Sequence, residues 1–133
     1  MGYGLPAAVA AATASPDRDV FAVAGDGCFM MSLQEMATAC HHNLRMTVIL
    51  VNNARYGTIR VHQEREFPGR ISGTDMVNPD FCELAKSFGA GAAQVSDVDG
   101  FAKALADARA RGGVNLIEVQ QPSSLLAPGV WLD

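Results

Sequence analysis

Short apolar runs recur along this chain, and polar or turn-forming residues follow each of them. The clearest runs are residues 20–25 (VFAVAG), 47–51 (TVILV) and 114–119 (VNLIEV). Runs of this kind, continuous rather than alternating, are typical of strands that are buried in a parallel sheet. We expect a fourth, shorter strand at residues 92–95.

The segments between these strands carry the signals of helices. Ser32 and Glu35 have the spacing of a capping box. Asn78 followed by Pro79 has the pattern of an N-cap and a first-turn proline. Helices are therefore expected over residues 5–13, from Ser32 to about His41, from Asn78 to Gly89, and from Ser96 to Gly112.

The alternation of strands and helices predicts an α/β fold. We expect a three-layer sandwich with a largely parallel sheet and helices on both faces, formed by one domain over residues 1–133. Ligands of such sheets bind at the carboxyl ends of the strands. The GDG sequence at residues 25–27 and the NN pair at residues 52–53 fall at two of these ends. Residues 55–77 are polar and lack clear periodicity, so they predict a long loop that is functional or mobile.

Composition narrows the classes of function. The chain is 49% hydrophobic and 18% charged, and its net charge of −4 is scattered without a basic stripe, which argues against nucleic-acid binding. An anionic cofactor would need a local site. The apolar runs are too short to cross a membrane, and no signal peptide is indicated. Three cysteines without CxxC spacing favour reduced thiols in a cytoplasmic protein.

The GDG sequence combines close backbone access with a negative charge. Glycines on both sides of Asp26 allow the backbone to approach a ligand and to point N–H groups at phosphate oxygens. The Asp26 carboxylate would repel a bare phosphate, so a cation is expected between the two. The alternative is a simple strand-to-loop turn.

Asn53 lies 27 residues after Asp26, with one helix and one strand between them. A βαβ crossover of that length can bring the two strand ends side by side. A carboxylate, an amide oxygen and a nearby backbone carbonyl would form a ligand set of hard oxygens that suits Mg²⁺ or Ca²⁺. The alternative is that the two asparagines merely form a turn.

A GDG sequence followed at this distance by an apolar strand ending in NN resembles the thiamine-diphosphate motif of pyruvate decarboxylase, acetolactate synthase and benzoylformate decarboxylase. The resemblance extends to MGYGLPAA at residues 1–8, YGTI at residues 56–59 and NPDF at residues 78–81. It covers nearly the whole chain and is closest to the acetolactate-synthase-like branch.

The resemblance implies a role for each matching position. Asp26 and Asn53 would bind Mg²⁺ through their side chains, and Arg55 would bind it through its backbone carbonyl. Met1 would wedge beneath the thiazolium ring and bend the cofactor. Residues that would contact the diphosphate or lie beside it are Gly25, Gly27, Cys28, Tyr56 and Gly57, and residues that would face the substrate are Thr58, Ile59 and His62.

The family also implies an activity and partners. A 2-oxo acid would be decarboxylated, joined to an acceptor, or both, so the enzyme would be a lyase or transferase, decarboxylase or carboligase. The activating glutamate of this family lies on a pyrimidine-binding domain, usually from a partner subunit, and no residue of this chain matches it. We therefore expect a domain truncated at its N-terminus, without the pyrimidine-binding and central domains; the alternative is one chain of a two-chain enzyme. It would be inactive alone and part of a homodimer or tetramer when intact.

The competing hypothesis is a non-catalytic α/β module that binds a nucleotide or a protein. A common nucleotide fold would show GxGxxG after its first strand, and this chain does not. Among other residues, His41 and His42 are expected at a helix C-terminus, and Met30 and Met31 in the core. A mixed-charge group is expected on a solvated face or at a subunit contact: Arg60, Glu64, Arg65, Glu66 and Arg70.

Overall fold

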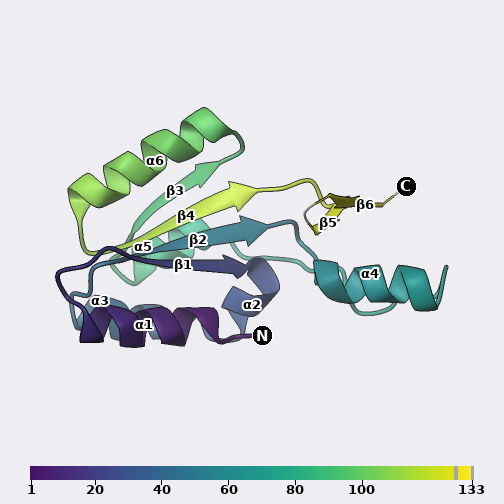
Figure 1. Cartoon of the computed structure of the whole chain (residues 1–133), viewed down its shortest axis with the longest axis horizontal. Coiled ribbons are helices and arrows are strands. Elements are labelled where there is room, and N and C mark those ends of the chain that lie inside the picture. The colour runs from purple at the N-terminus through teal and green to yellow at the C-terminus, as the bar shows by residue number, and fades with distance from the viewer. Residues whose placement is uncertain (128, 133) are drawn as a thin grey trace.

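The computed structural model describes residues 1–127 and 129–132, and its centre is a four-stranded parallel sheet (Figure 1). The strand order is β1-β2-β4-β3. The four strands are β1 (Val20–Gly25), β2 (Met46–Asn52), β3 (Gly91–Val95) and β4 (Val114–Gln120). All four predicted strands are therefore confirmed, each to within one residue at either end.

Helices cover both faces of this sheet, which confirms the predicted three-layer α/β sandwich. On one face lie α1 (Gly4–Ala14), α2 (Asp26–Met30), α3 (Glu35–His41) and α5 (Phe81–Ser87), and on the other lies α6 (Val98–Arg111). Beyond the carboxyl ends of the strands lie α4 (Gly57–Glu66) and a small antiparallel pair, β5 (Leu125–Ala127) and β6 (Val130–Trp131) (Figure 1). No helix among residues 1–127 and 129–132 is long and apolar enough to span a membrane.

The larger core lies between the sheet and α1, α2, α3 and α5. Alanines of α1 and β1 let this helix pack close to the strand, since neither side contributes bulk; Ala8 and Ala22 are both 5% exposed. Phe29 of α2 and Phe81 of α5 pack edge to face, with ring centroids 5.7 Å apart. This contact fixes α2, which begins with Asp26, against the body of the domain.

The opposite face of the sheet is only partly covered. The α6 helix packs on β3 and β4, with Ala104 and Ala108 against Ile117. On the edge strand β1, Phe21 is 44% exposed and Val23 is 67% exposed. The described residues therefore leave an apolar strip on β1 that α6 does not reach.

The strand register brings the two polar motifs together. Gly25 pairs with Val51 at the end of the β1–β2 ladder, and Asn52 pairs with Gln120 on β4. The expected side-by-side placement of the two strand ends is therefore confirmed. Asp26 follows directly as the first residue of α2.

The expected long loop at residues 55–77 is wrong in part, because residues 57–66 form α4. The segment is closed at its base by antiparallel pairing: Tyr56 N donates to Thr74 O at 2.9 Å, and Met76 N donates to Ala54 O at 2.9 Å. Arg60 was expected on a solvated face or at a subunit contact, yet within this chain it is 8% exposed, and its guanidinium lies 3.4 Å from both Thr74 and Asp75. This tertiary anchoring stabilises a helix whose own apolar pattern is weak.

Three expected helix caps differ from the structure. Within the described residues the buried Ser32 hydroxyl has no hydrogen-bond partner, because α3 begins only at Glu35 after a turn that continues from α2. The cap of α5 is Asp80, which accepts from Glu83 N at 2.9 Å. The cap of α6 is Asp97, which accepts from Gly100 N at 2.7 Å.

The two methionines after the GDG sequence differ in their environment. Met30 packs against the larger core, as expected. Met31 was expected there too, but it is 50% exposed, because it follows the end of the short helix α2 and does not belong to the packed face of that helix.

Candidate functional site

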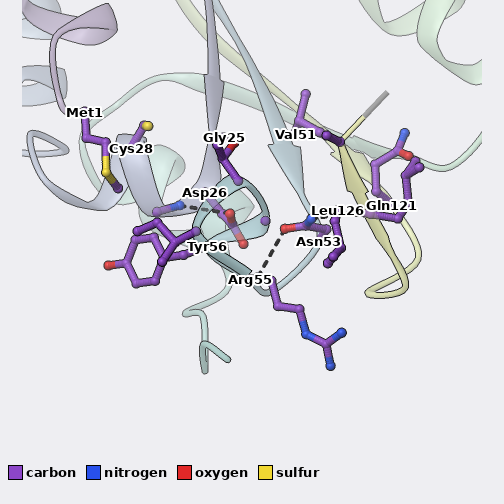
Figure 2. Close-up of a pocket in the computed structure, with 16 residues that line it drawn as sticks. Met1, Gly25, Asp26, Cys28, Val51, Asn53, Arg55, Tyr56, Gln121 and Leu126 are labelled. Carbon is purple, nitrogen blue, oxygen red and sulfur yellow. Dashed lines mark hydrogen bonds between the residues drawn. The ribbon is translucent and has the colours of Figure 1, made fainter. Parts of the chain in front are cut away.

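A pocket of about 540 Å³ opens at the carboxyl ends of β1 and β2 (Figure 2). It brings together residues from the chain start, the GDG turn, the end of β2, the beginning of α4 and β5. Eleven of the twelve predicted site residues line it: Met1, Gly25, Asp26, Gly27, Cys28, Asn53, Arg55, Tyr56, Gly57, Thr58 and Ile59.

Asp26 lies at the inner end of the pocket and is 2% exposed. Its Oδ1 accepts a hydrogen bond from the Gly27 N–H at 2.9 Å, and its Oδ2 accepts one from Asn78 Nδ2 at 2.7 Å. A carboxylate has about four lone-pair positions. Each Asp26 oxygen therefore keeps acceptor capacity for a further ligand.

Asn53 follows β2, and the hydrogen bonds at both ends of its amide set its orientation. Nδ2 donates to Leu125 O at 2.8 Å, and Oδ1 accepts from Arg55 N at 3.1 Å. A flipped amide would place the Asn53 oxygen against the Leu125 carbonyl oxygen, so the hydrogen-bond partners determine which atom is the oxygen. Figure 2 shows the Asn53 oxygen and the Asp26 carboxylate pointing toward one another.

The Arg55 guanidinium points away from these two side chains (Figure 2). Its Nε donates to Asp75 Oδ1 at 2.6 Å, and its NH1 donates to Ser123 O at 2.9 Å. These bonds hold the positive charge outside the space between Asp26 and Asn53. An arginine side chain contains no oxygen, so the backbone carbonyl is the only oxygen that Arg55 can offer to a cation.

The donor set consists of oxygen atoms, which suit a hard cation better than a soft one that prefers thiolate or imidazole ligands. Residues 1–127 and 129–132 contain no cluster of three or more histidine, cysteine, aspartate or glutamate side chains that could hold a metal. One carboxylate, one amide oxygen and a backbone carbonyl suit Mg²⁺, which usually completes its octahedron with phosphate oxygens and water.

Two glycines are required by close packing around the pocket. A side-chain carbon at Gly27 would overlap the Tyr56 ring, and one at Gly57 would overlap the carbonyl oxygen of Leu126. The same carbon at Gly57 would lie 3.2 Å from Asn53 Nδ2. The absence of side chains here lets α4 and β5 close against the metal-binding candidates.

The N–H groups expected to face a diphosphate are not all available to one. The Gly27 N–H is donated to Asp26 Oδ1, and the Tyr56 N–H is donated to Thr74 O at 2.9 Å. Both residues still line the pocket. Cys28 and Gly57 are therefore the stronger candidates for backbone contacts to phosphate.

Of the three predicted substrate-facing residues, Thr58 and Ile59 line the pocket and His62 does not. His62 is exposed on α4, where its Nδ1 lies 3.1 Å from an Arg65 guanidinium nitrogen. The pocket mouth is partly apolar, because Met1 is 66% exposed and Ile59 is 42% exposed.

Sequence reasoning missed two contributors to the site. Asn78 was interpreted as a helix cap, but its amide bonds Asp26 and Asn52 instead. Leu125 and Leu126 follow Pro122, where the last predicted strand had already ended, yet β5 folds back over the pocket. A polar residue directly before Pro79 is extended and free to point inward, which is the only local signal for Asn78.

The chain matches a family model described as "Thiamine pyrophosphate enzyme, C-terminal TPP binding domain" over residues 1–119. It is 42% identical over 99 residues to the acetolactate synthase large subunit of Parasynechococcus marenigrum, covering 73% of this chain and 16% of that protein. It is 44% identical over 90 residues to the acetolactate synthase isozyme 2 large subunit of Escherichia coli, covering 67% of this chain and 16% of that protein.

Solved structures show the same fold. A thiamine diphosphate-dependent 4-hydroxybenzoylformate decarboxylase from Rhodococcus jostii RHA1 aligns with a TM-score of 0.86 and 34% identity over 92% of this chain and 23% of that one. A benzoylformate decarboxylase from Polynucleobacter necessarius aligns with a TM-score of 0.84 and 27% identity over 92% of this chain and 24% of that one. The chain thus spans about a quarter or less of the length of these proteins.

Proposed function

Since the chain belongs to the thiamine pyrophosphate enzymes, as their C-terminal TPP-binding domain, we propose that its pocket holds the diphosphate of thiamine diphosphate through Mg²⁺. The observation that carries this proposal is the placement of Asp26 and Asn53. They follow two adjacent parallel strands, and their oxygens face each other across the pocket (Figure 2).

Asp26, Asn53 and the backbone carbonyl of Arg55 would supply the protein ligands of the cation. Asp26 supplies the negative charge that makes a divalent cation favourable, and its burial keeps that charge from being screened by solvent. The cation in turn would neutralise the repulsion between the Asp26 carboxylate and a diphosphate. Backbone N–H groups of Cys28 and Gly57 would add contacts to the diphosphate oxygens.

The apolar part of the pocket would hold the rings of the cofactor. Met1, Ile59 and Leu126 line this part, and Met1 would wedge beneath the thiazolium ring. When bound, thiamine diphosphate supplies a nucleophilic carbon and an electron sink for chemistry beside a carbonyl group. The residues of this chain would bind, bend and orient it and keep water away from its reactive side.

The proposed reaction is decarboxylation of a 2-oxo acid, carboligation, or both, in a lyase or transferase. The names of the relatives support this class, because they include acetolactate synthases and benzoylformate decarboxylases. The pyrimidine-binding domain and its activating glutamate would come from elsewhere in a homodimer or tetramer. Thr58 and Ile59 would face the substrate, and the isolated 133-residue chain would have no turnover.

Calorimetric titration tests this proposal. Thiamine diphosphate is titrated into the chain with and without Mg²⁺, beside an Asp26→Ala, Asn53→Ala double variant. An Asp107→Ala variant is the control, because that side chain is 67% exposed on α6, away from the pocket. Mg²⁺-dependent binding that only the double variant loses supports the proposal. Equal heats from all three folded proteins count against it.

A further inference from the structure

Glu118 on β4 is a buried carboxylate that the proposed cofactor site does not use. It is 2% exposed, and within residues 1–127 and 129–132 it forms no ion pair with a lysine, arginine or histidine. Oε1 accepts from Asn52 Nδ2 and from Gln120 Nε2, both at 2.6 Å. Oε2 accepts from Gln94 Nε2 at 3.1 Å and lies 3.8 Å from the Cys82 sulfur. Neutral donors alone therefore hold this carboxylate.

Burying a carboxylate is costly unless it is well hydrogen-bonded, and an apolar side chain at this position would avoid the cost. The presence of a buried glutamate therefore indicates a specific role. Glu118 could simply bind β2, β3 and β4 together through their side chains. However, one of its two shortest bonds goes to Asn52, the residue next to the proposed ligand Asn53. Glu118 is therefore connected by hydrogen bonds, through Asn52, to the residues around the proposed cation site.

The hydrogen bond between Asn52 and Glu118 also fixes the other end of the Asn52 amide. Its Nδ2 is taken by Glu118, so its Oδ1 is turned to the other side, where it accepts from Ala54 N at 3.0 Å and from Asn78 Nδ2 at 2.9 Å. A flipped Asn52 amide would set its oxygen against the Glu118 carboxylate and its NH₂ against two donors. The Glu118 carboxylate, together with the Ala54 N–H, thus determines which end of the Asn52 amide faces Asn78.

Asn78 completes the connection to Asp26. One N–H of its Nδ2 reaches Asn52 Oδ1, and the other reaches Asp26 Oδ2 at 2.7 Å. Both protons are therefore committed, and both point to oxygens. The Asn78 Oδ1 is a buried acceptor without a partner among the described residues, which shows that the donors, rather than the acceptor, set the orientation of this amide.

We propose that Glu118 is a positioning residue for the cation site: through Asn52 and Asn78 it fixes the Asp26 carboxylate in the orientation that binds the divalent cation. This inference rests on the proposed function. Glu118 would act by fixing the orientation of the two amide side chains that lie between it and Asp26. The acceptor-only Glu118 carboxylate makes the Asn52 amide present its NH₂ to Glu118 and its oxygen to Asn78. The Asn78 amide then presents its NH₂ both to Asn52 Oδ1 and to the last acceptor, Asp26 Oδ2.

The connection itself is tested in the metal-free chain, by the ¹H–¹⁵N spectrum of Glu118→Gln. The substituted side chain would carry an NH₂ group where the wild type has only acceptors, so the Asn52 amide loses one of the two contacts that fix its orientation and keeps only the Ala54 N–H. The expected result is a shift of the Asn78 side-chain NH₂ signals and of the Gly27 N–H signal, which reports on Asp26 Oδ1. If neither signal moves, the inference is overturned, whether or not the chain binds cofactor.

The consequence for the cation is tested by Mg²⁺-dependent binding of thiamine diphosphate to Asn78→Ala and Glu118→Gln. We expect each variant to lose about tenfold in apparent Mg²⁺ affinity, the size typical for losing a hydrogen-bond partner of a metal ligand. Asn115→Ala is the matched control. This asparagine is 3% exposed on β4 and makes several hydrogen bonds, but it lies at the amino end of the strand.

A purely structural role gives a different pattern. Asn115→Ala should then lower the melting temperature as much as the other two variants, and all three should keep the wild-type Mg²⁺ affinity in their folded fraction. That outcome overturns the inference. If Glu118→Gln does not fold, Asn52→Ala decides in its place, because it removes the side chain that joins Glu118 to Asn78 and is itself only partly buried. If the wild-type chain shows no Mg²⁺-dependent binding, the proposed function fails, and the metal-free spectrum still decides the connection.

Discussion

The Asp26 carboxylate accepts a 2.7 Å hydrogen bond from Asn78, a residue 52 positions further along the chain. The bond joins the turn after β1 to the residue that precedes the α5 segment. It leaves both carboxylate oxygens able to accept one more ligand on the pocket side. The metal-binding candidates are thus held in place by the fold before any cation is present, which lowers the cost of ordering them on binding.

Asp26→Asn should separate cofactor binding from folding. The substitution is isosteric, but the new NH₂ group must face either the Gly27 N–H or the Asn78 NH₂, both of which are donors, so we expect a modest fall in melting temperature without ligand. In the wild type, Mg²⁺ with thiamine diphosphate at about 100 times Kd should add about 2.7 kcal/mol of stability, and the variant should lose this gain. Differential scanning fluorimetry with and without ligand measures both quantities. A ligand-induced gain equal to that of the wild type would exclude Asp26 as a ligand of the cation.

Gly57→Ala should open the contact between α4 and β5. The added carbon would overlap the Leu126 carbonyl oxygen, which belongs to backbone and cannot rotate aside. We expect a loss of about 1–3 kcal/mol, measured by urea unfolding. Gly4→Ala is the control, because its carbon would meet only the Val23 carbonyl oxygen, at an ordinary 3.7 Å. Equal stability of the two variants would show that β5 does not pack tightly on α4.

Arg60 should hold α4 to the rest of the domain. Its guanidinium bonds Glu64 at 2.8 Å and lies 3.4 Å from both Thr74 and Asp75. Arg60→Ala should therefore speed proteolytic cleavage within residues 57–73 several-fold, while the sheet keeps its stability. Limited proteolysis with mass spectrometry checks this. Arg65→Ala, at a side chain 63% exposed, should leave the cleavage rate unchanged, and the expectation fails if both variants are cut equally fast.

Cys82 should make stability depend on pH in the alkaline range. Burial, together with the Glu118 and Asp80 carboxylates, raises the pKa of its thiol from 9.0 to about 11. Between these values the unfolded chain loses the proton while the folded chain keeps it. The free energy of unfolding should therefore fall as the pH rises from 9 to 11, and below pH 9 this group should have no effect. Urea unfolding across this range should show a shallower fall for Cys82→Ala; parallel curves would contradict the assignment.

The sequence was sufficient for the parts of the fold that hydrophobic pattern controls. Each predicted strand lies where its apolar run lies, because the strands of a parallel sheet that packs against helices are mostly apolar. The spacing of the GDG and NN sequences predicted that Asp26 and Asn53 are neighbours. The carboxyl ends of two adjacent parallel strands lie at the same edge of a sheet, as those of β1 and β2 do here. Eleven of the twelve predicted residues accordingly line one pocket.

The sequence was insufficient wherever a long-range polar contact decides the structure. Asn78 carries a local cap signal, and only the folded chain shows that its amide is used by Asp26 instead. The α4 helix has few apolar residues, so its stability depends on Arg60 and on pairing across its base, which periodicity cannot reveal. The contribution of β5 to the pocket depends on a fold-back after Pro122 that no nearby motif indicates.

The most direct measurement is the anomalous diffraction of a crystal of this chain grown with thiamine diphosphate and Mn²⁺, which replaces Mg²⁺ at sites of hard oxygen ligands. We expect one strong peak beyond the ends of β1 and β2, within about 2.5 Å of an Asp26 carboxylate oxygen and of the Asn53 amide oxygen, a distance range set by oxygen coordination of hard cations. Density for the diphosphate should adjoin it. A cofactor bound in the pocket with no peak there, or a peak that avoids both residues, would contradict the account.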